Sequence, residues 1–138
     1  MAVTVKNVVI WRAEVAHLRG ELARVLQPLA EAAANLQVIM AYAEGERGLV
    51  EICPISGKKV TDAAKKAGFF PSSKPTLLVQ GDDRAGLGSR IAKAIAEQGV
   101  SISFDVTQVI GRKFSSVYGF QAEDDARKAA AAIKKASR

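Results

Sequence analysis

The sequence predicts an α+β fold made of two β-α-β-β-α modules in tandem, each an antiparallel sheet with its helices on one face. Two observations lead to this prediction. Segments with apolar residues at every second position and segments of helical period follow one another in the same order in both halves of the 138-residue chain. One gap-free shift of the chain against itself also places Gly20 on Gly86 and superimposes the two patterns. We expect the modules over 1–70 and 71–138.

The elements of the first module follow from its apolar periodicity. Apolar residues at every second position predict strands, and a stripe that repeats every three or four residues predicts a helix. Pro28 falls inside the first helical stripe, where it removes a backbone hydrogen bond and is expected to bend or break the helix. Ser56 is a candidate N-cap for the second helix. The predicted order is a strand over 9–15, a helix over 22–29, strands over 36–42 and 49–55, and a helix over 58–67.

The second module repeats this order. Leu77 and Val79 mark its first strand, and Gly99 is expected to end its first helix as a C-terminal cap. The segment 69–75, which contains two prolines and two serines, is expected to be a linker between the modules. The remaining predicted elements are a helix over 87–95, strands over 102–106 and 114–120, and a helix over 123–136.

The fourth strand that a ferredoxin-like sheet normally contains is not obvious in either half. Phe69 and Phe70 are too few to form it after the first module, and the sequence stops at Arg138 soon after the last helix. A three-stranded sheet with an open edge readily pairs with another strand. We therefore expect edge pairing between the halves or between two chains, and we predict a homodimer.

Composition places the chain among ordinary globular proteins. It is 49% hydrophobic and 25% charged, which excludes disorder, and its single cysteine excludes an internal disulfide and a multi-cysteine zinc site. Apolar runs such as 36–43 are far shorter than the roughly 20 residues that span a bilayer. The first residues show no signal peptide, so a cytoplasmic location is expected. The net charge of +6 is spread along the chain, so nucleic-acid binding is not favoured.

Two loops resemble the signature stretch of the ACT domain family. That stretch is a strand, a loop of the form Asp-x-Pro-Gly-x-Leu, a helix, and a small residue-x-Asn before the second strand. The second half reads Asp83-Arg84-Ala85-Gly86-Leu87 with Ser101 following the helix. The first half reads His17-Leu18-Arg19-Gly20 with Asn35 following the helix. The chain therefore resembles a tandem pair of ACT domains over nearly its whole length.

The loops also depart from the family pattern. Ala85 and Arg19 stand in place of the proline, His17 in place of the aspartate, and Ser101 in place of the asparagine. The resemblance implies a ferredoxin-like fold and a regulatory role, in which the module binds a small amino acid or related metabolite. Such a module either acts through a partner protein, for example an enzyme, or is a free-standing sensor. The departures bear on the ligand site more than on the fold.

The chemistry of such a site can be stated from the residues. A glycine at a helix start lets a ligand approach the backbone, and the free N–H groups of the first turn attract a carboxylate. Asp83 or Asn35 would accept a hydrogen bond from an ammonium group. Alternatively, Gly20 and Gly86 only permit tight turns and the polar residues cap helices. The candidate ligand-binding residues are Asp82, Asp83, Arg84, Ala85, Gly86, Leu87, Ser101, His17, Leu18, Arg19, Gly20 and Asn35.

We place this site at the junction between the two halves or between two chains. Asn35 and Ser101 are expected to begin strands that lie beside the two loops. The second-half loop is the stronger candidate, because it departs less from the family pattern.

No set of residues indicates catalysis, and no cofactor or metal is predicted. Gly86-x-Gly88 lacks the third glycine of a dinucleotide-binding loop, and Ser56-Gly57-Lys58 lacks the first glycine of a phosphate-binding loop. Cys53 lies on an apolar strand and is expected to be a small core residue. The lone histidine, His17, has no second imidazole or thiolate at metal-binding spacing. The chain is therefore not expected to be an enzyme.

Two alternatives to a ligand-binding regulator remain open. Ferredoxin-like sheets that recognise RNA display aromatic side chains on the open face of the sheet, but the RNA-recognition signatures are absent here. A purely structural oligomerisation module would need no ligand. The aromatic residues that could serve an RNA-binding face are Phe104, Phe114, Tyr118 and Phe120.

Overall fold

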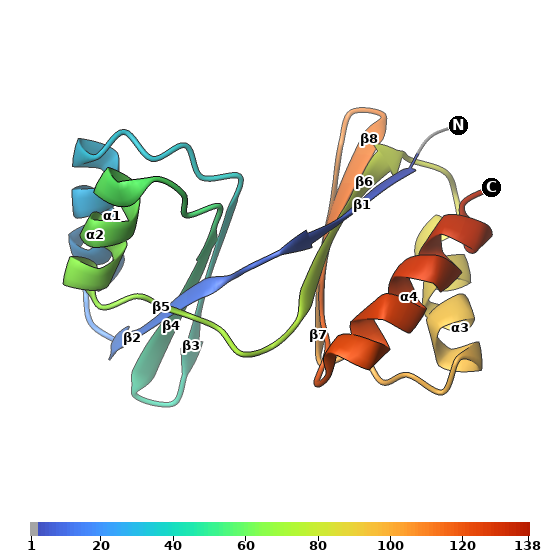
Figure 1. The fold of residues 1–138 in the computed structure, drawn as a ribbon. Helices are drawn as coiled ribbons and strands as arrows, with labels where there is room; N and C mark the ends of the chain where they lie inside the picture. Colours follow the sequence, from blue (N-terminus) through green and yellow to red (C-terminus); the bar gives the residue numbers. More distant parts are fainter. Residues whose placement is uncertain (1–2) are drawn as a thin grey trace. The chain divides into compact units, whose positions relative to one another are not determined.

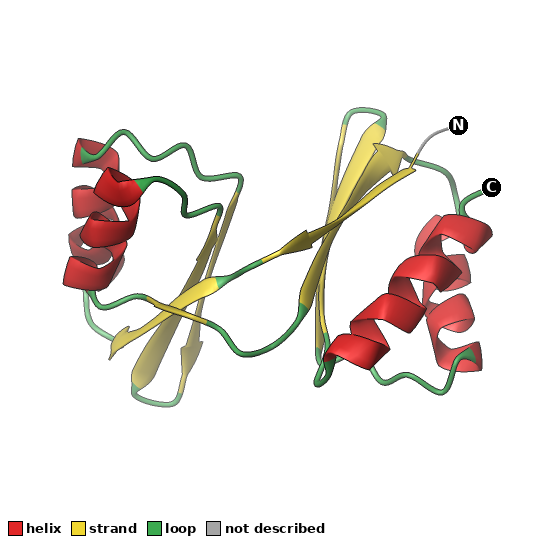
Figure 2. Cartoon of the chain, viewed as in Figure 1, coloured by secondary structure: helices red, strands yellow, loops and turns green. Residues whose placement is uncertain are grey.

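The computed structural model describes residues 3–138, so Met1 and Ala2, at the start of the predicted first module, lie outside the described residues. The chain forms two compact units, each with two helices on one face of a sheet (Figures 1 and 2). Unit 2 is Val9–Ser73. Unit 1 combines the N-terminal segment up to Val8 with Lys74–Arg138. The observed division therefore differs from a single boundary at residue 70, because the first strand belongs with the second half.

Unit 2 contains the predicted strand-helix-strand-strand-helix series and one more strand. Its sheet has the order β3-β4-β2-β5 with antiparallel neighbours. Trp11 and Ile52 from the sheet, Val25 and Leu29 from the first helix, and Phe69 form most of its core. The elements are β2 (Trp11–Ala16), α1 (Glu21–Glu31), β3 (Val38–Glu44), β4 (Arg47–Cys53), α2 (Lys58–Ala67) and β5 (Phe70–Pro71).

Unit 1 repeats the strand-helix-strand-strand-helix series around its own core, but its fourth strand precedes the series. Its sheet order is β1-β6-β8-β7, again with antiparallel neighbours. Leu77, Ile91, Ile95, Phe120 and Ile133 are each at most 1% exposed within this core. The elements are β6 (Thr76–Asp82), α3 (Leu87–Glu97), β7 (Phe104–Ile110), β8 (Lys113–Gly119), α4 (Glu123–Ala136) and the N-terminal β1 (Val3–Val8).

The expectation that the fourth strand is missing is wrong for both sheets. In unit 2 the two-residue β5 pairs with β2, and the preceding Phe69 is fully buried. The segment 69–75 is therefore not simply a linker. In unit 1 the fourth strand is β1, which pairs with β6 along its whole length. Val3 and Val5 pack against the core while Thr4 and Lys6 are exposed, as expected for a strand with one buried face.

Two local expectations in unit 2 are also corrected. Of the bend or break expected at Pro28, the break does not occur, because helix α1 continues through Pro28 to Glu31. Proline inside a helix costs about 3 kcal/mol, but burial of Val25 and Leu29 on either side contributes about 1.5–3 kcal/mol each. Helix α2 has Gly57 and not Ser56 at its N-cap, and no side chain makes a capping hydrogen bond there.

Other local expectations are confirmed. Helices α2 and α4 have the predicted bounds, and Gly99 follows α3 with a φ of +73°, in the left-handed region that favours glycine. Cys53 is buried, as expected of a small core residue.

Gly119 allows the cross-strand Phe104 ring to lie over the backbone, where a Cβ atom would overlap it.

The pairing of β1 with β6 gives a first prediction. Replacing Val5 with Asp should lower the free energy of unfolding by about 2–3 kcal/mol, because a carboxylate would be forced toward the apolar core of unit 1. Urea denaturation followed by far-UV circular dichroism measures this change. Thr4→Asp is the matched control on the opposite face of the same strand and should change stability by no more than about 0.5 kcal/mol. Equal losses in the two variants would contradict the observed strand orientation.

Candidate ligand-binding loops

The loop after β6 turns into α3 through Gly86. This glycine has a φ of +79° and caps the helix, which has no side-chain hydrogen bond to its first turn. A Cβ atom on Gly86 would have no other atom within 4 Å apart from its chain neighbours. The backbone here is therefore open to a ligand. Leu87 donates its backbone N–H to the Arg84 carbonyl at 3.1 Å, so the following N–H groups of the first helical turn, those of Gly88 and Ser89, are the ones suited to an anionic group.

The hairpin between β7 and β8 holds this loop in place. Asp82, the last residue of β6, forms an ion pair with Lys113 at the start of β8. The hydrogen bond with the Lys113 ammonium, followed by its charge, lowers the pKa of the Asp82 carboxyl below its ordinary value. The next residue, Asp83, donates its backbone N–H to the Arg112 carbonyl at 2.8 Å and leaves its side chain exposed. Asp83 is thus available to a ligand, whereas Asp82 is already paired.

Three other predicted residues of this loop have different environments. Arg84 donates from Nη2 to the Ser137 carbonyl at 3.3 Å, which links the loop to the end of α4. Its Nε is buried without a hydrogen-bond partner in the described part of the chain. Ala85 is exposed, and Leu87 is 3% exposed within the core. Leu87 therefore anchors the helix and is not available to a ligand.

The loop after β2 has the same geometry in unit 2. Gly20 caps α1 with a φ of +87°, and no atom lies within 4 Å of a Cβ placed there beyond its chain neighbours. His17 donates its backbone N–H to the Glu46 carbonyl of the β3–β4 hairpin at 2.9 Å. The side chains of His17, Leu18 and Arg19 are all exposed. Both units therefore present an open glycine at a helix start, supported by a neighbouring hairpin.

Ser101 and Asn35 do not lie beside the loops of their own modules, contrary to expectation. In unit 1, β6 and β7 both pair antiparallel with β8 and so run in the same direction. The loop follows the end of β6, whereas Ser101 precedes the start of β7. Helix α3, about 16 Å long for 11 residues, returns the chain to the opposite end of the sheet. Asn35 is separated from Gly20 in the same way, since β2 and β3 are both antiparallel to β4.

The aromatic residues considered for RNA binding are mostly in the core. Phe114, Tyr118 and Phe120 are at most 5% exposed and pack with the helices of unit 1. They are not displayed on the open face of the sheet, so this support for nucleic-acid binding is lost. Within residues 3–138, no group of three or more His, Cys, Asp or Glu side chains is placed to hold a metal ion. None of the helices described is long and apolar enough to cross a membrane.

Sequence reasoning missed the residues that hold the loops. Lys113, the Arg112 carbonyl and the Ser137 carbonyl all contact the segment 82–84, but each is distant from it in sequence. The strand register brings Asp82 opposite Lys113. The available signal in the sequence was the opposite charge of Asp82 and Lys113, which lie at the end of β6 and the start of β8. This signal could be used only if the register of the two strands was known.

Several solved structures share this fold. A protein from Bacteroides thetaiotaomicron aligns with a TM-score of 0.77 at 14% identity, covering 91% of this chain and 87% of that one. The regulatory subunit of aspartate kinase from Thermus thermophilus aligns with a TM-score of 0.68 at 15% identity, covering 100% and 98%. A putative C-terminal regulatory domain of aspartate kinase from Porphyromonas gingivalis aligns with a TM-score of 0.58 at 15% identity, covering 97% and 94%.

These similarities show the fold of the chain. No protein-family model matches the sequence, and no curated protein matches it. The fold is that of tandem ferredoxin-like modules of the ACT type, in which two helices cover one face of a four-stranded antiparallel sheet. The resemblance that the two loops suggested is therefore confirmed at the level of the fold.

The ion pair at the loop gives a second prediction. Because the pKa of Asp82 is lowered in the folded protein, its pairing stabilises the fold above the ordinary aspartate pKa and is lost as the pH falls through the lowered value. Replacing Lys113 with Gln should raise the pKa of Asp82 toward its usual value of about 4. Carbon-detected NMR titration of the carboxylates measures both values.

Asp124 serves as the internal control for this titration. The hydrogen bond and charge of Lys128 lower its pKa independently of Lys113, so the substitution should leave the pKa of Asp124 unchanged. An unchanged Asp82 pKa in Lys113→Gln would show that this ion pair does not form in solution.

Proposed function

We propose that this protein is a non-catalytic regulatory module that binds a small amino acid or related metabolite at its glycine loops. One observation carries the proposal: both units place an open left-handed glycine at the start of an 11-residue helix, beside a supporting hairpin. The fold shared with aspartate kinase regulatory subunits supports a regulatory role. A partner enzyme would then receive the signal, and we expect both to act in the cytoplasm.

The ligand chemistry follows from the loop in unit 1. The first-turn N–H groups of α3 would bind the carboxylate of the ligand, with Gly86 allowing close approach. The exposed carboxylate of Asp83 would bind the ammonium group. This arrangement favours an amino acid over a simple carboxylate or amine, because both charged ends of the ligand are recognised.

A homodimer would complete the site, for a different reason from the one first expected. The fourth strands are present, but β7 remains an edge strand of its sheet. It exposes Val106, Val109 and Ile110, the last with 68% of its surface accessible. Antiparallel pairing of β7 with β7 of a second copy would bring Ser101 of one chain to the loop end of the other. The site would therefore include Ser101 only in the dimer.

The proposed site is tested by ligand binding to loop variants. A thermal-shift screen of the twenty amino acids should identify a ligand, and isothermal titration gives its Kd. Asp83→Ala should weaken binding by about tenfold or more, because a charge-assisted hydrogen bond is lost. Gly86→Val should also weaken binding, because its side chain would occupy the open approach and strain a backbone with positive φ. Unchanged binding by both folded variants would place the site elsewhere.

The proposed dimer is tested by analytical ultracentrifugation at micromolar concentration. Wild type should sediment as two chains, and Ile110→Lys should weaken the dimer by about tenfold or more because a charge would be placed at the paired edge. Leu22→Lys, which alters an exposed apolar residue of α1, is the matched control and should leave the dimer intact. A monomeric wild type would refute the proposal.

A further inference from the structure

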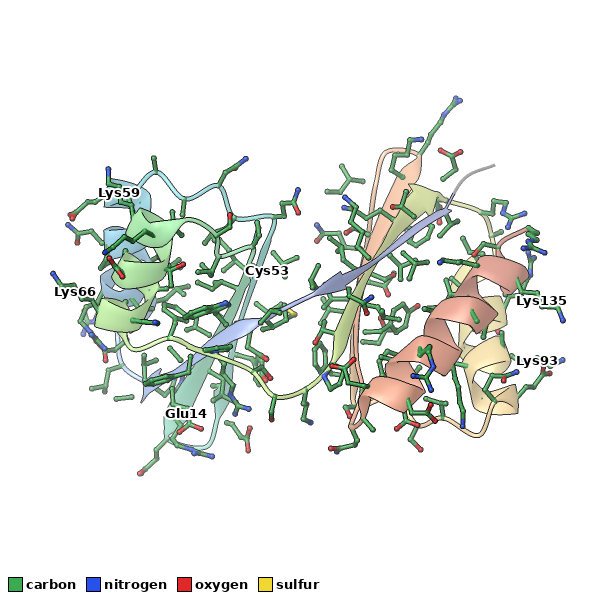
Figure 3. The ribbon with its side chains drawn as sticks, viewed as in Figure 1. Glu14, Cys53, Lys59, Lys66, Lys93 and Lys135 are labelled. Carbon is green, nitrogen blue, oxygen red and sulfur yellow. The ribbon has the colours of Figure 1, made fainter. Side chains whose placement is uncertain are left out.

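The sheet of unit 2 carries charged side chains on the side opposite its helices. Side chains alternate along β2, so Arg12 and Glu14 lie on the face opposite Trp11 and Ala13, which belong to the core. Figure 3 shows Glu14 away from helix α2, which carries the labelled Lys59 and Lys66. Strand β5 adds Phe70 beside Arg12, because the two residues are register partners. These side chains line a pocket of about 480 Å³.

Arg12 lacks an acceptor for part of its guanidinium group. Its Nε is buried and has no hydrogen-bond partner among residues 3–138. Its Nη2 lies 3.6 Å from Oε1 of Glu14, which is too long for a hydrogen bond. Buried donors are rarely left unpaired in folded proteins, and the Nε and Nη groups of arginine match the two oxygens of a carboxylate. Arg12 therefore has an ion-pair partner in Glu14, and its guanidinium group, on a side chain that is 38% exposed, keeps donors for the carboxylate of a ligand.

Glu14 and Phe70 supply two further features of the pocket. Oε2 of Glu14 accepts a hydrogen bond from Nη1 of Arg47 at 3.0 Å, while Oε1 faces Arg12. A carboxylate can accept more hydrogen bonds than this, so Glu14 has capacity for an ammonium group. Phe70 is 67% exposed although it is aromatic, and Pro71 lies next to it in the lining. The pocket thus combines a guanidinium, a carboxylate and an apolar surface.

We propose that this pocket is a binding site for an α-amino acid with an apolar or aromatic side chain. The ligand carboxylate bonds to Arg12, its ammonium group bonds to Glu14, and its side chain packs on Phe70. A volume of about 480 Å³ lies within the range of roughly 300–1,000 Å³ typical of small-molecule sites. The inference goes beyond the proposed function, because it needs neither the loop at Gly20 nor the loop at Gly86.

Isothermal titration with L-leucine, L-phenylalanine and L-tryptophan tests the site in the full chain. At least one of them should bind to wild type. The two analogues of L-phenylalanine that lack one charged group, 3-phenylpropionate and 2-phenylethylamine, should bind at least about tenfold more weakly than L-phenylalanine if it is the ligand. Failure of all three amino acids to bind would overturn the proposal, as would equal binding by the analogues.

Variants of the pocket identify where the amino acid binds. Arg12→Gln and Phe70→Ala should each weaken binding by about tenfold or more, and Arg12→Lys should not restore it because lysine lacks the planar fork. Lys58→Gln is the matched control, since Lys58 pairs with Asp62 on α2 and neither residue lines the pocket, and binding by this variant should stay within about twofold of wild type. Full binding by folded Arg12→Gln and Phe70→Ala would overturn the proposal.

The same titrations separate this inference from the proposed function. Binding that is lost in Asp83→Ala but kept in Arg12→Gln would assign the ligand to the loop, which refutes the pocket and supports the loop. If Arg12→Gln does not fold, NMR shift changes in wild type decide the question. Ligand-induced shifts at Arg12, Glu14 and Phe70 support the pocket, and shifts confined to 83–87 overturn it.

Discussion

The antiparallel pairing of β1 with β6 is the interaction on which the rest of the architecture depends. It runs from Val3 opposite Gly81 to Val8 opposite Thr76, and it adds the fourth strand to the sheet of unit 1. Val3 and Val5 thereby join the core formed by α3, α4 and β6. Because β1 belongs to unit 1, the whole of unit 2 lies in the chain between β1 and the remainder of that unit. The two modules are therefore nested in the sequence and not simply consecutive.

The two units have the same order of strands in their sheets. They differ in where in the chain the fourth strand comes from. Unit 2 uses the short β5, which follows its second helix, whereas unit 1 uses β1, which precedes all its other elements. In both, the second strand of the module, β3 or β7, remains at a sheet edge. The same connectivity places each glycine loop beside the adjacent hairpin and sends Asn35 or Ser101 to the other end of the sheet. Each loop therefore presents only part of the site that the family resemblance implied.

Charged side chains position the loop before α3, and two arginines of the described residues keep an unpaired donor. Asp82 is paired with Lys113, so its side chain holds the loop to the hairpin. Asp83 holds the loop only through its backbone N–H, which donates to the Arg112 carbonyl, and its side chain is exposed. Arg12 and Arg84 each keep a buried Nε with no partner in the described residues. Arg84 already bonds to the end of α4, whereas Arg12 lines a pocket. The two arginines therefore differ in their surroundings and not in their charge.

The sequence by itself determined the elements whose cause is local. Apolar periodicity identified both pairs of helices, and α2 and α4 begin and end where it predicted, because the 3.6-residue repeat is a property of a short segment. Only the tertiary structure decided which strands pair. Thr4 meets Gln80 at a separation of 76 residues, and nothing in the alternation of Val3 and Val5 specifies that partner. One edge of β6 was unpaired and could pair with β1. Helices α1 and α3 return the chain along their sheets, and this places Asn35 and Ser101 at the end of the sheet opposite the loops. The candidate loops could thus be found from the sequence. Which residues of other elements lie beside those loops, and which lie at the other end of the sheet, could not.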